Sequence, residues 1–124
     1  MSLIVGLYFI INLRKKPSSN LNSVDAIVPA YNEEPCLEES LKSLFANPYI
    51  NKVICVNDGS SDGTENLLNR MVLEWPDKLI AVNQSNTGKG GALMNGLNYA
   101  TMPQVFLTDA DTYVPPDKNG LGYA

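Results

Sequence analysis

Two acidic residues, Asp109 and Asp111, follow a short apolar run at 105–107 and are separated by a single alanine. The run is rich in strand-favouring residues and suits a strand that is buried on both faces. In an open α/β sheet, ligands bind beyond the carboxyl ends of the strands, so both carboxylates are expected at such an edge. Their hard oxygen atoms suit Mg²⁺ or Mn²⁺ better than zinc. The alternative is turn chemistry alone, because Asp is favoured in turns after strands.

Three other apolar runs also end in residues that could bind a ligand. The run at 24–28 is followed by Pro29, Tyr31 and Glu33. The run at 52–56 is followed by Asp58, and the run at 78–82 leads to a glycine-rich loop that contains Lys89. Tyr31, Asp58 and the acidic pair thus place ligand-type side chains on three separate loops.

Helical patterns lie between the apolar runs and determine the expected fold. We expect strands at 24–28, 52–56, 78–82 and 105–107, with Pro29 ending the first of them. The three helices between them each have an apolar face; the residues concerned are Leu37, Leu41, Leu44 and Phe45, then Leu67, Leu68, Met71, Val72 and Trp75, then Ala92, Leu93, Gly96, Leu97 and Ala100. Asn32 can cap the first helix. Alternation of this kind predicts an α/β fold with a doubly wound, mostly parallel sheet covered on both faces.

The order of the strands decides whether the polar loops meet. If the four strands are arranged 3-2-1-4, the first and last are neighbours and the switch point lies between them. Tyr31, Asp58 and the pair Asp109 and Asp111 would then border one crevice.

Composition excludes several classes of function. The chain of 124 residues suits one domain, and its net charge of -4 argues against nucleic-acid binding, which needs a basic face. It contains no histidine, which removes histidine-based catalysis and metal ligation. No Gly-x-Gly-x-x-Gly follows the first run, and Gly90 stands after Lys89 where a P-loop needs Ser or Thr. A receiver fold would carry its acids after the first and third strands, not after the second and fourth.

The amino-terminal residues 1–16 form an apolar stretch that ends in three basic residues. The stretch is shorter than the roughly 20 residues that cross a bilayer. It fits a signal-type apolar region, an interfacial helix or part of a longer span. Because the basic cluster follows the apolar residues, we expect attachment to the cell membrane with the globular part on the cytoplasmic side. Residues 17–23 are a polar linker, and the globular domain is expected at 24–124.

The two cysteines, Cys36 and Cys55, do not have the spacing of a metal site. Cys55 lies inside an apolar run. We expect free thiols in a reducing compartment, and a single disulfide is the alternative.

Four motifs, in this order, resemble the family 2 inverting glycosyltransferases of the GT-A fold. They are the stretches 28–33 (VPAYNE), 57–64 (NDGSSDGT), 86–90 (NTGKG) and 109–111 (DAD). The resemblance covers roughly 24–116 and implies the amino-terminal half of a three-layer GT-A domain. Asn57 departs from the pattern, since relatives often have Asp at that position.

The resemblance also implies roles for individual residues. Tyr31 would line the uracil pocket and Asp58 would accept a hydrogen bond from the base, with Pro29 and Glu33 in the same nucleotide site. Asp109 and Asp111 would hold the nucleotide sugar through Mg²⁺ or Mn²⁺, with Asp111 the more direct ligand, and Lys89 would lie near the diphosphate. The alternatives are a loop aromatic for Tyr31, a turn-stabilising carboxylate for Asp58 and a solvated lysine at a helix start for Lys89.

The resemblance extends to processive polysaccharide synthases that use UDP-N-acetylglucosamine. Inverting transfer needs a base that deprotonates the acceptor, and no residue here matches the family's base, so we expect it beyond Ala124. The expected partners are a UDP-sugar donor, a carbohydrate or lipid-linked acceptor and the membrane. A polyprenyl-phosphate sugar transferase and a non-catalytic nucleotide-sugar-binding fragment are the alternatives. We also expect self-association, because the outer edge of the strand at 105–107 would be uncovered.

Overall fold

The computed structural model describes residues 9–12 and 23–115, which form five strands and three helices. Along the chain these are β1 (Phe9–Asn12), β2 (Val24–Ala30), α1 (Glu34–Phe45), β3 (Ile50–Asp58), α2 (Thr64–Glu74), β4 (Leu79–Gln84), α3 (Lys89–Leu97) and β5 (Gln104–Leu107). From Val24 onward, strands and helices alternate as the sequence predicts. The expected linker at 17–23 lies almost wholly outside the described residues.

The described strands form one sheet in the order β1-β5-β2-β3-β4. β2 pairs in parallel with β3 and with β5, and β3 pairs in parallel with β4. The predicted arrangement of the four parallel strands, 3-2-1-4, is therefore confirmed. Because β5 lies beside β2, the loops after these strands meet at the same sheet edge.

β1 adds an antiparallel strand that the sequence did not predict. Phe9 pairs with Leu107 and Asn12 with Gln104, so β1 covers the outer edge of β5. The expectation that this edge is uncovered is wrong, because an earlier part of the chain supplies the missing hydrogen-bonding partner. The other residues of the apolar stretch 1–16 lie outside the described residues. No helix in the described part of the chain is long and apolar enough to span a bilayer, and membrane association stays a prediction.

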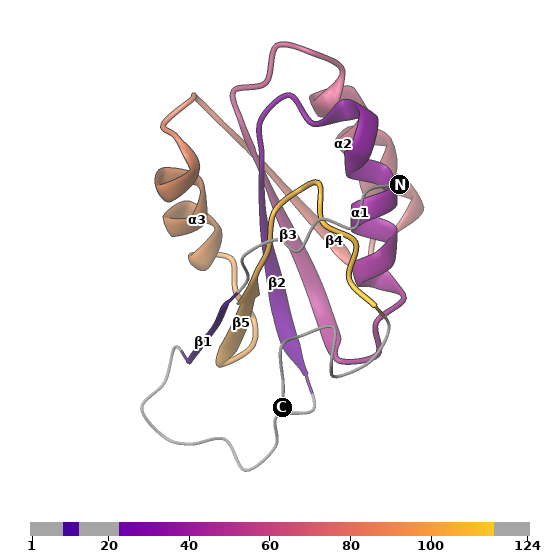
Figure 1. The fold of residues 1–124 in the computed structure, drawn as a ribbon, viewed down its shortest axis with the longest axis vertical. Helices are drawn as coiled ribbons and strands as arrows, with labels where there is room; N and C mark the ends of the chain where they lie inside the picture. Colours follow the sequence, from indigo (N-terminus) through magenta and orange to yellow (C-terminus); the bar gives the residue numbers. More distant parts are fainter. Residues whose placement is uncertain (1–8, 13–22, 116–124) are drawn as a thin grey trace.

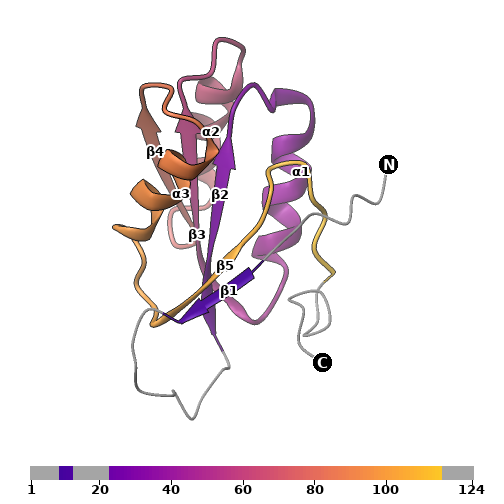
Figure 2. The ribbon, with the colours of Figure 1, turned by 60° about the vertical axis from the view of Figure 1, so that its left-hand side comes forward.

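Helices cover both faces of the sheet, with α3 on one face and α1 and α2 on the other (Figure 1 and Figure 2). Leu37, Leu41 and Leu68 pack with β-strand residues on the α1 and α2 face, and Ala92 packs with Ile27 and Ile54 on the α3 face. Burial on both faces explains why the strands are nearly continuous apolar runs. Cys36 and Cys55 are free thiols, and burial raises the pKa of the Cys55 thiol to about 12.

Pro29 does not end its strand as predicted, because β2 continues to Ala30. The carbonyl of Ile27 accepts a hydrogen bond from the amide of Thr108, so Ile27 directs its backbone groups toward β5. Pro29 lies two residues further along β2, so its backbone nitrogen also points toward the β5 side of the strand. At that level β5 has already ended, at Leu107. The missing N–H of Pro29 therefore removes no hydrogen bond from the sheet.

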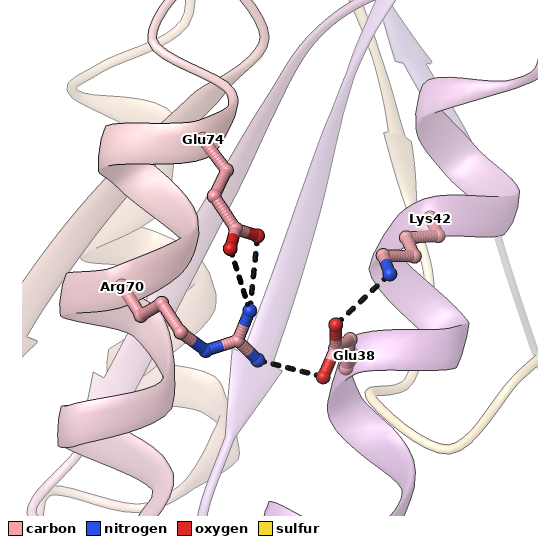
Figure 3. A network of polar contacts seen from close by, with 4 residues as sticks. All are labelled: Glu38, Lys42, Arg70 and Glu74. Atoms are coloured by element: carbon pink, nitrogen blue, oxygen red, sulfur yellow. Dashed lines mark hydrogen bonds and ion pairs between the residues drawn. The ribbon is translucent and has the colours of Figure 1, made fainter.

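An exposed ion-pair network joins α1 to α2 on the outer surface (Figure 3). Arg70 of α2 pairs with Glu38 of α1 at 2.7 Å and with Glu74 of its own helix at 2.9 Å. Lys42 pairs with Glu38 at 2.9 Å. Because these side chains are solvent-exposed, each pair contributes little to stability.

Asp25 is a fully buried carboxylate near the amino-terminal end of β2, opposite the polar loops. It accepts hydrogen bonds from the backbone amides of Lys52, Thr101 and Met102. These bonds fix the turn before β5 against the start of β3. These hydrogen bonds account for the burial of the Asp25 carboxylate. Asp25 does not line the cavity described below.

Candidate functional site

An open cavity of about 280 Å³ lies at the carboxyl ends of β2, β3 and β5. It is lined by Pro29, Ala30, Tyr31, Glu33, Asp58, Lys89, Asp109, Ala110 and Asp111. The structure thus brings every residue that the sequence nominated for a site to one cavity, as the strand order requires. Their individual contacts with a ligand stay predictions.

Tyr31 gives the cavity an exposed aromatic surface. Its side chain is 51% exposed, whereas most large apolar residues of β2 and β3 are fully buried. An aromatic ring left open beside a polar cavity can stack on a planar ligand such as a nucleobase. Tyr31 therefore does not pack into the core, which was the alternative for this residue.

Asn32 holds the loop that carries Tyr31, and it does not cap α1 as predicted. Its φ of 52° lies in the left-handed region, which Asn tolerates better than most residues. Its side-chain oxygen accepts hydrogen bonds from the amides of Ser61 and Asp62, at 2.8 and 3.3 Å. The loop after β2 is therefore fixed by the loop after β3. Sequence spacing cannot reveal such a contact between two separate loops.

Glu33 lies beside the acidic pair. Its amide donates a hydrogen bond to the Thr64 hydroxyl at 3.1 Å, which fixes its backbone. Burial raises the pKa of the Glu33 carboxyl, and the negative charges of Asp111 and Asp109 raise it further. The cavity therefore concentrates negative charge before any ligand binds.

Asp58 is 3% exposed, and its carboxylate accepts hydrogen bonds from the glycine-rich loop. The amides of Thr87 and Gly88 donate to it at 2.8 and 2.9 Å, and Gln84 Nε2 donates at 2.9 Å. Burial by itself would raise the pKa of Asp58, but these hydrogen bonds together lower it below its ordinary value. Gln84 was not singled out from the sequence, where it is one polar residue at the end of a strand.

Two glycines allow the loops after β3 and β4 to meet. Gly59 has a φ of 70°, and a Cβ atom there would lie 2.7 Å from the amide nitrogen of Asn86. Gly88 has a φ of 90° directly before α3, a conformation that side chains disfavour. The close approach and the two positive φ values account for glycine at both positions.

Lys89 is the first residue of α3 and forms an ion pair with Asp109, which follows β5. The Lys89 side chain is 60% exposed and that of Asp109 is 28% exposed. The ammonium group therefore contacts Asp109 but remains accessible to an anionic ligand.

Side chains of α1 and of the turn after it hold the segment that follows Asp111. The Ser40 hydroxyl donates to the carbonyl of Thr112 at 2.7 Å, and the amide of Val114 donates to the Ser43 hydroxyl at 3.1 Å. Asn47 Nδ2 donates to the carbonyl of Pro115 at 2.8 Å. The roles of Ser40 and Ser43, which lie on α1, were not recognised from the sequence, where the apolar face of the helix dominates the pattern.

The chemistry of the cavity fits a divalent cation. Of its charged lining residues, Glu33, Asp58, Asp109 and Asp111 are acids and Lys89 is the single base. No three potential ligands among the described residues are grouped closely enough to enclose a metal ion by themselves. Mg²⁺ at nucleotide sites is usually held by one or two carboxylates together with phosphate oxygens. Asp109 and Asp111 fit that arrangement.

The pattern that describes the family "Glycosyl transferase family 2" matches residues 25–120, most of the chain and all of the cavity. The chain belongs to glycosyl transferase family 2. The glycosyltransferase YaiP of Escherichia coli (strain K12) is 60% identical over 123 residues, which are 99% of this chain and 31% of YaiP. The poly-beta-1,6-N-acetyl-D-glucosamine synthase of Staphylococcus aureus (strain COL) is 36% identical over 86% of this chain and 26% of the synthase. This family 2 chain therefore spans about a third or less of these relatives.

Solved transferases share the fold of this family 2 chain. The mannosyltransferase PcManGT from Pyrobaculum calidifontis, in complex with GDP-Man and Mn²⁺, has a TM-score of 0.67 and 34% identity, covering 82% of this chain and 32% of PcManGT. TarS 1-349 of S. aureus, in complex with UDP-GlcNAc, has a TM-score of 0.64 and 26% identity, covering 76% of this chain and 28% of TarS. The chain therefore has the parallel, helix-covered sheet of the amino-terminal part of a GT-A transferase.

Proposed function

We propose that this chain binds the donor of a glycosyltransferase that transfers a sugar such as N-acetylglucosamine from a UDP-sugar to a growing polysaccharide, with inversion. Two relatives support this donor. The similar synthase of S. aureus is a poly-beta-1,6-N-acetyl-D-glucosamine synthase, and the similar TarS structure contains UDP-GlcNAc. Because the chain matches only part of these proteins, the acceptor site and the activity are proposals about a larger enzyme.

The observation that carries the proposal is the combination of chemical groups in one cavity. Tyr31 offers an aromatic face, Lys89 offers a cation, and Asp109 and Asp111 offer hard oxygen ligands. A nucleoside diphosphate needs these three features, for its base, its phosphates and its bound metal. An anionic ligand without a metal would be repelled by the surplus of carboxylates.

In this proposal the residues of the chain bind and orient the donor. Tyr31 stacks on the uracil and Lys89 contacts the diphosphate, while Asp109 and Asp111 hold Mg²⁺ or Mn²⁺. The cation would stabilise the negative charge that develops on the departing diphosphate. Inverting transfer also needs a base for the acceptor hydroxyl, and none of the described residues is assigned to that step.

Isothermal titration of the chain with UDP in the presence of Mn²⁺ tests donor binding. We expect binding that is lost without Mn²⁺, lost in Tyr31→Ala and retained in Tyr31→Phe, which keeps the aromatic face. Absence of UDP binding by the unmodified chain would contradict the proposal. A transfer assay with labelled UDP-N-acetylglucosamine then separates an enzyme from a nucleotide-sugar-binding fragment, which binds without transferring or hydrolysing the sugar.

A second candidate donor is GDP-mannose, because the similar PcManGT structure contains GDP-Man and Mn²⁺. A mannosyl transfer, including transfer to a polyprenyl phosphate, would use the same metal and diphosphate groups. GDP in place of UDP in the same titration decides between them. Tighter binding of GDP than of UDP would favour the mannose donor.

We also propose that the segment 1–16, of which Phe9–Asn12 pair with β5, attaches the protein to the cell membrane, with the globular part on the cytoplasmic side. The apolar composition of this segment and its three basic residues support the proposal. Sedimentation of the chain with vesicles that contain anionic lipid tests it. We expect co-sedimentation that high salt reduces only in part, since apolar insertion is not screened. A chain that stays in the supernatant at low salt contradicts the proposal.

A further inference from the structure

Gln84 ends β4 as the direct neighbour of Asp58, which ends β3. The two residues are register partners in the parallel pair of β3 and β4, so their side chains point to the same face of the sheet. That face is covered by α3, because Val56 and Val82, two residues earlier on each strand, pack with Ala92. Gln84 therefore lies where a strand residue can contact both Asp58 and α3.

The side-chain amide of Gln84 uses both of its polar atoms within the protein. Its Nε2 donates to Oδ1 of Asp58 at 2.9 Å and to the Thr87 hydroxyl at 2.8 Å. Its Oε1 accepts from Nδ2 of Asn95, a residue of α3, at 2.7 Å. Because an ionised carboxylate can only accept hydrogen bonds, Asp58 orients the Gln84 amide with its nitrogen toward β3 and its oxygen toward Asn95. Asn95, Gln84 and Asp58 thus form a hydrogen-bond relay.

The relay leaves the two oxygens of the Asp58 carboxylate unequal. In addition to the bond from Gln84, Oδ1 accepts from the amide and the hydroxyl of Thr87, at 2.8 and 3.4 Å. Among the described residues, Oδ2 accepts only from the amide of Gly88, at 2.9 Å. A carboxylate oxygen has about two acceptor positions, so Oδ1 is filled and Oδ2 retains one. Because Asp58 lines the cavity, Oδ2 is the oxygen that can accept a hydrogen bond from a ligand there.

A single open acceptor oxygen discriminates between the nucleobases of the two candidate donors. Uracil presents one N–H donor, at N3, between two carbonyl groups. Guanine presents two adjacent donors, N1–H and its amino group, and a carboxylate accepts both of them only when both of its oxygens are open. With Oδ1 filled, one guanine donor would be left without an acceptor, which lowers affinity.

We propose that Gln84, held by Asn95, is a positioning residue that determines base specificity: by filling Oδ1 of Asp58, it leaves Oδ2 for the single imide N–H of uracil and disfavours guanine. The inference rests on the proposed function, because it takes the ligand to be a nucleoside diphosphate, and on the base contact that the family resemblance implies for Asp58. Neither Gln84 nor Asn95 belongs to the four motifs of that resemblance. Neither lines the cavity, so both would act through Asp58.

Gln84→Met tests the inference with three ligands in saturating Mn²⁺: UDP, GDP, and UDP that is methylated at N3 and therefore lacks the imide N–H. We expect the unmodified chain to bind UDP about tenfold more tightly than either of the other two, because each leaves a hydrogen bond unmade. Methionine keeps the side-chain length but donates nothing to Oδ1. UDP affinity should fall by about fivefold, the effect of one hydrogen bond, whereas GDP affinity should stay or rise. The preference for UDP over GDP would then be about twofold or less.

Asn83→Ala is the matched control. Asn83 and Asn57 form the neighbouring register pair, and their side chains share a hydrogen bond of 2.9 Å on the opposite face of the sheet. This control should leave all three affinities unchanged. Equal losses of UDP and GDP affinity in Gln84→Met would overturn the inference, because a general loss of structure does not alter the choice of base. An unmodified chain that prefers GDP, or that binds UDP and methylated UDP equally, would also overturn it.

Asn95→Ala tests the far end of the relay without touching Asp58, and it provides a second variant if Gln84→Met does not fold. Loss of Nδ2 allows the Gln84 amide to turn away, so the preference for UDP over GDP should fall by about two- to threefold, less than in Gln84→Met. In the Gln84→Met background, Asn95→Ala should have no further effect on this preference, and additive effects would contradict the inference. A chain that binds UDP with a preference that neither variant changes refutes this inference alone, whereas a chain that binds neither UDP nor GDP refutes the proposed function itself.

Discussion

Lys89 and Asp109 form an ion pair across the cavity, although one begins α3 and the other follows β5. The two residues are the cation and one of the carboxylates that a metal-bound diphosphate would engage. In this ion pair, each residue neutralises part of the charge of the other. Binding of a cation and a diphosphate would replace one contact with two, since Asp109 would bind the metal and Lys89 the phosphates.

Lys89→Met should therefore change the affinities for cation and nucleotide in opposite directions. Removing the ammonium frees Asp109, so we expect Mn²⁺ affinity without nucleotide to rise by about 1.4- to fivefold, the range that corresponds to an exposed ion pair of roughly 0.2–1 kcal/mol. UDP affinity in saturating Mn²⁺ should fall. Electron paramagnetic resonance measures free Mn²⁺ directly. Lys42→Met, which breaks an ion pair outside the cavity, should change neither affinity.

Asp111→Asn should remove the stabilisation that Mn²⁺ gives to the folded chain. A ligand at one hundred times its dissociation constant stabilises a protein by about 2.7 kcal/mol, and we expect the unmodified chain to gain about this amount. The variant should gain much less, because it lacks one of two carboxylate ligands. Urea unfolding with and without Mn²⁺ measures the difference. Asp77→Asn, on the exposed turn before β4, should behave like the unmodified chain.

Glu33→Gln should make the chain more stable at neutral pH in the absence of metal. Burial raises the pKa of Glu33, and the charges of Asp111 and Asp109 raise it further. When the pKa of a carboxyl is higher in the folded than in the unfolded chain, the ionised carboxyl is less stable in the folded chain. Ionisation of Glu33 at neutral pH therefore lowers the free energy of unfolding. The gain in the free energy of unfolding should disappear as the pH falls toward 4.5, the ordinary pKa of a glutamate carboxyl. Thermal unfolding at several pH values tests this, with the exposed Glu65→Gln as control.

Asp58→Asn should lower stability at neutral pH and lose this effect in acid. Burial would raise the pKa of Asp58, but its hydrogen bonds leave the pKa below 3.8. A carboxyl with a lowered pKa stabilises the fold above its unfolded-state pKa, and this contribution is lost as the pH falls through its folded-state value. We expect a loss of about 1–3 kcal/mol at neutral pH. Urea unfolding should show the free energies of unfolding of the variant and the unmodified chain converging below pH 3.8. A difference between them that stays constant with pH would contradict the assigned hydrogen bonds.

Much of the fold follows from local patterns in the sequence. The four parallel strands and three helices appear where apolar runs and helical faces predict them, because burial on both faces of a sheet imposes nearly continuous apolar strands. Pro29 shows where a local rule is insufficient. Proline ends a strand only where its missing amide would have had a partner, and whether a partner exists depends on the length of β5, a separate element.

The pairing of β1 with β5 was also beyond sequence reasoning. An apolar segment near the chain start has the same composition whether it enters a membrane or joins a sheet. Residues Phe9–Asn12 pair with β5 because β5 presents an edge of unpaired backbone groups nearby. That edge exists only after the chain has folded.

The sequence alone determined which residues could take part in chemistry: the types and spacing of Tyr31, Asp58, Lys89, Asp109 and Asp111 are local properties, and parallel strand order brings their loops to one edge. Tertiary structure decided how those residues are used. Asp58 binds the glycine-rich loop and Lys89 faces Asp109 because residues about 30 and 20 positions apart in the chain become hydrogen-bonding neighbours only when β3, α3 and β5 pack together. Such partnerships depend on distances in space, which spacing along the chain does not encode.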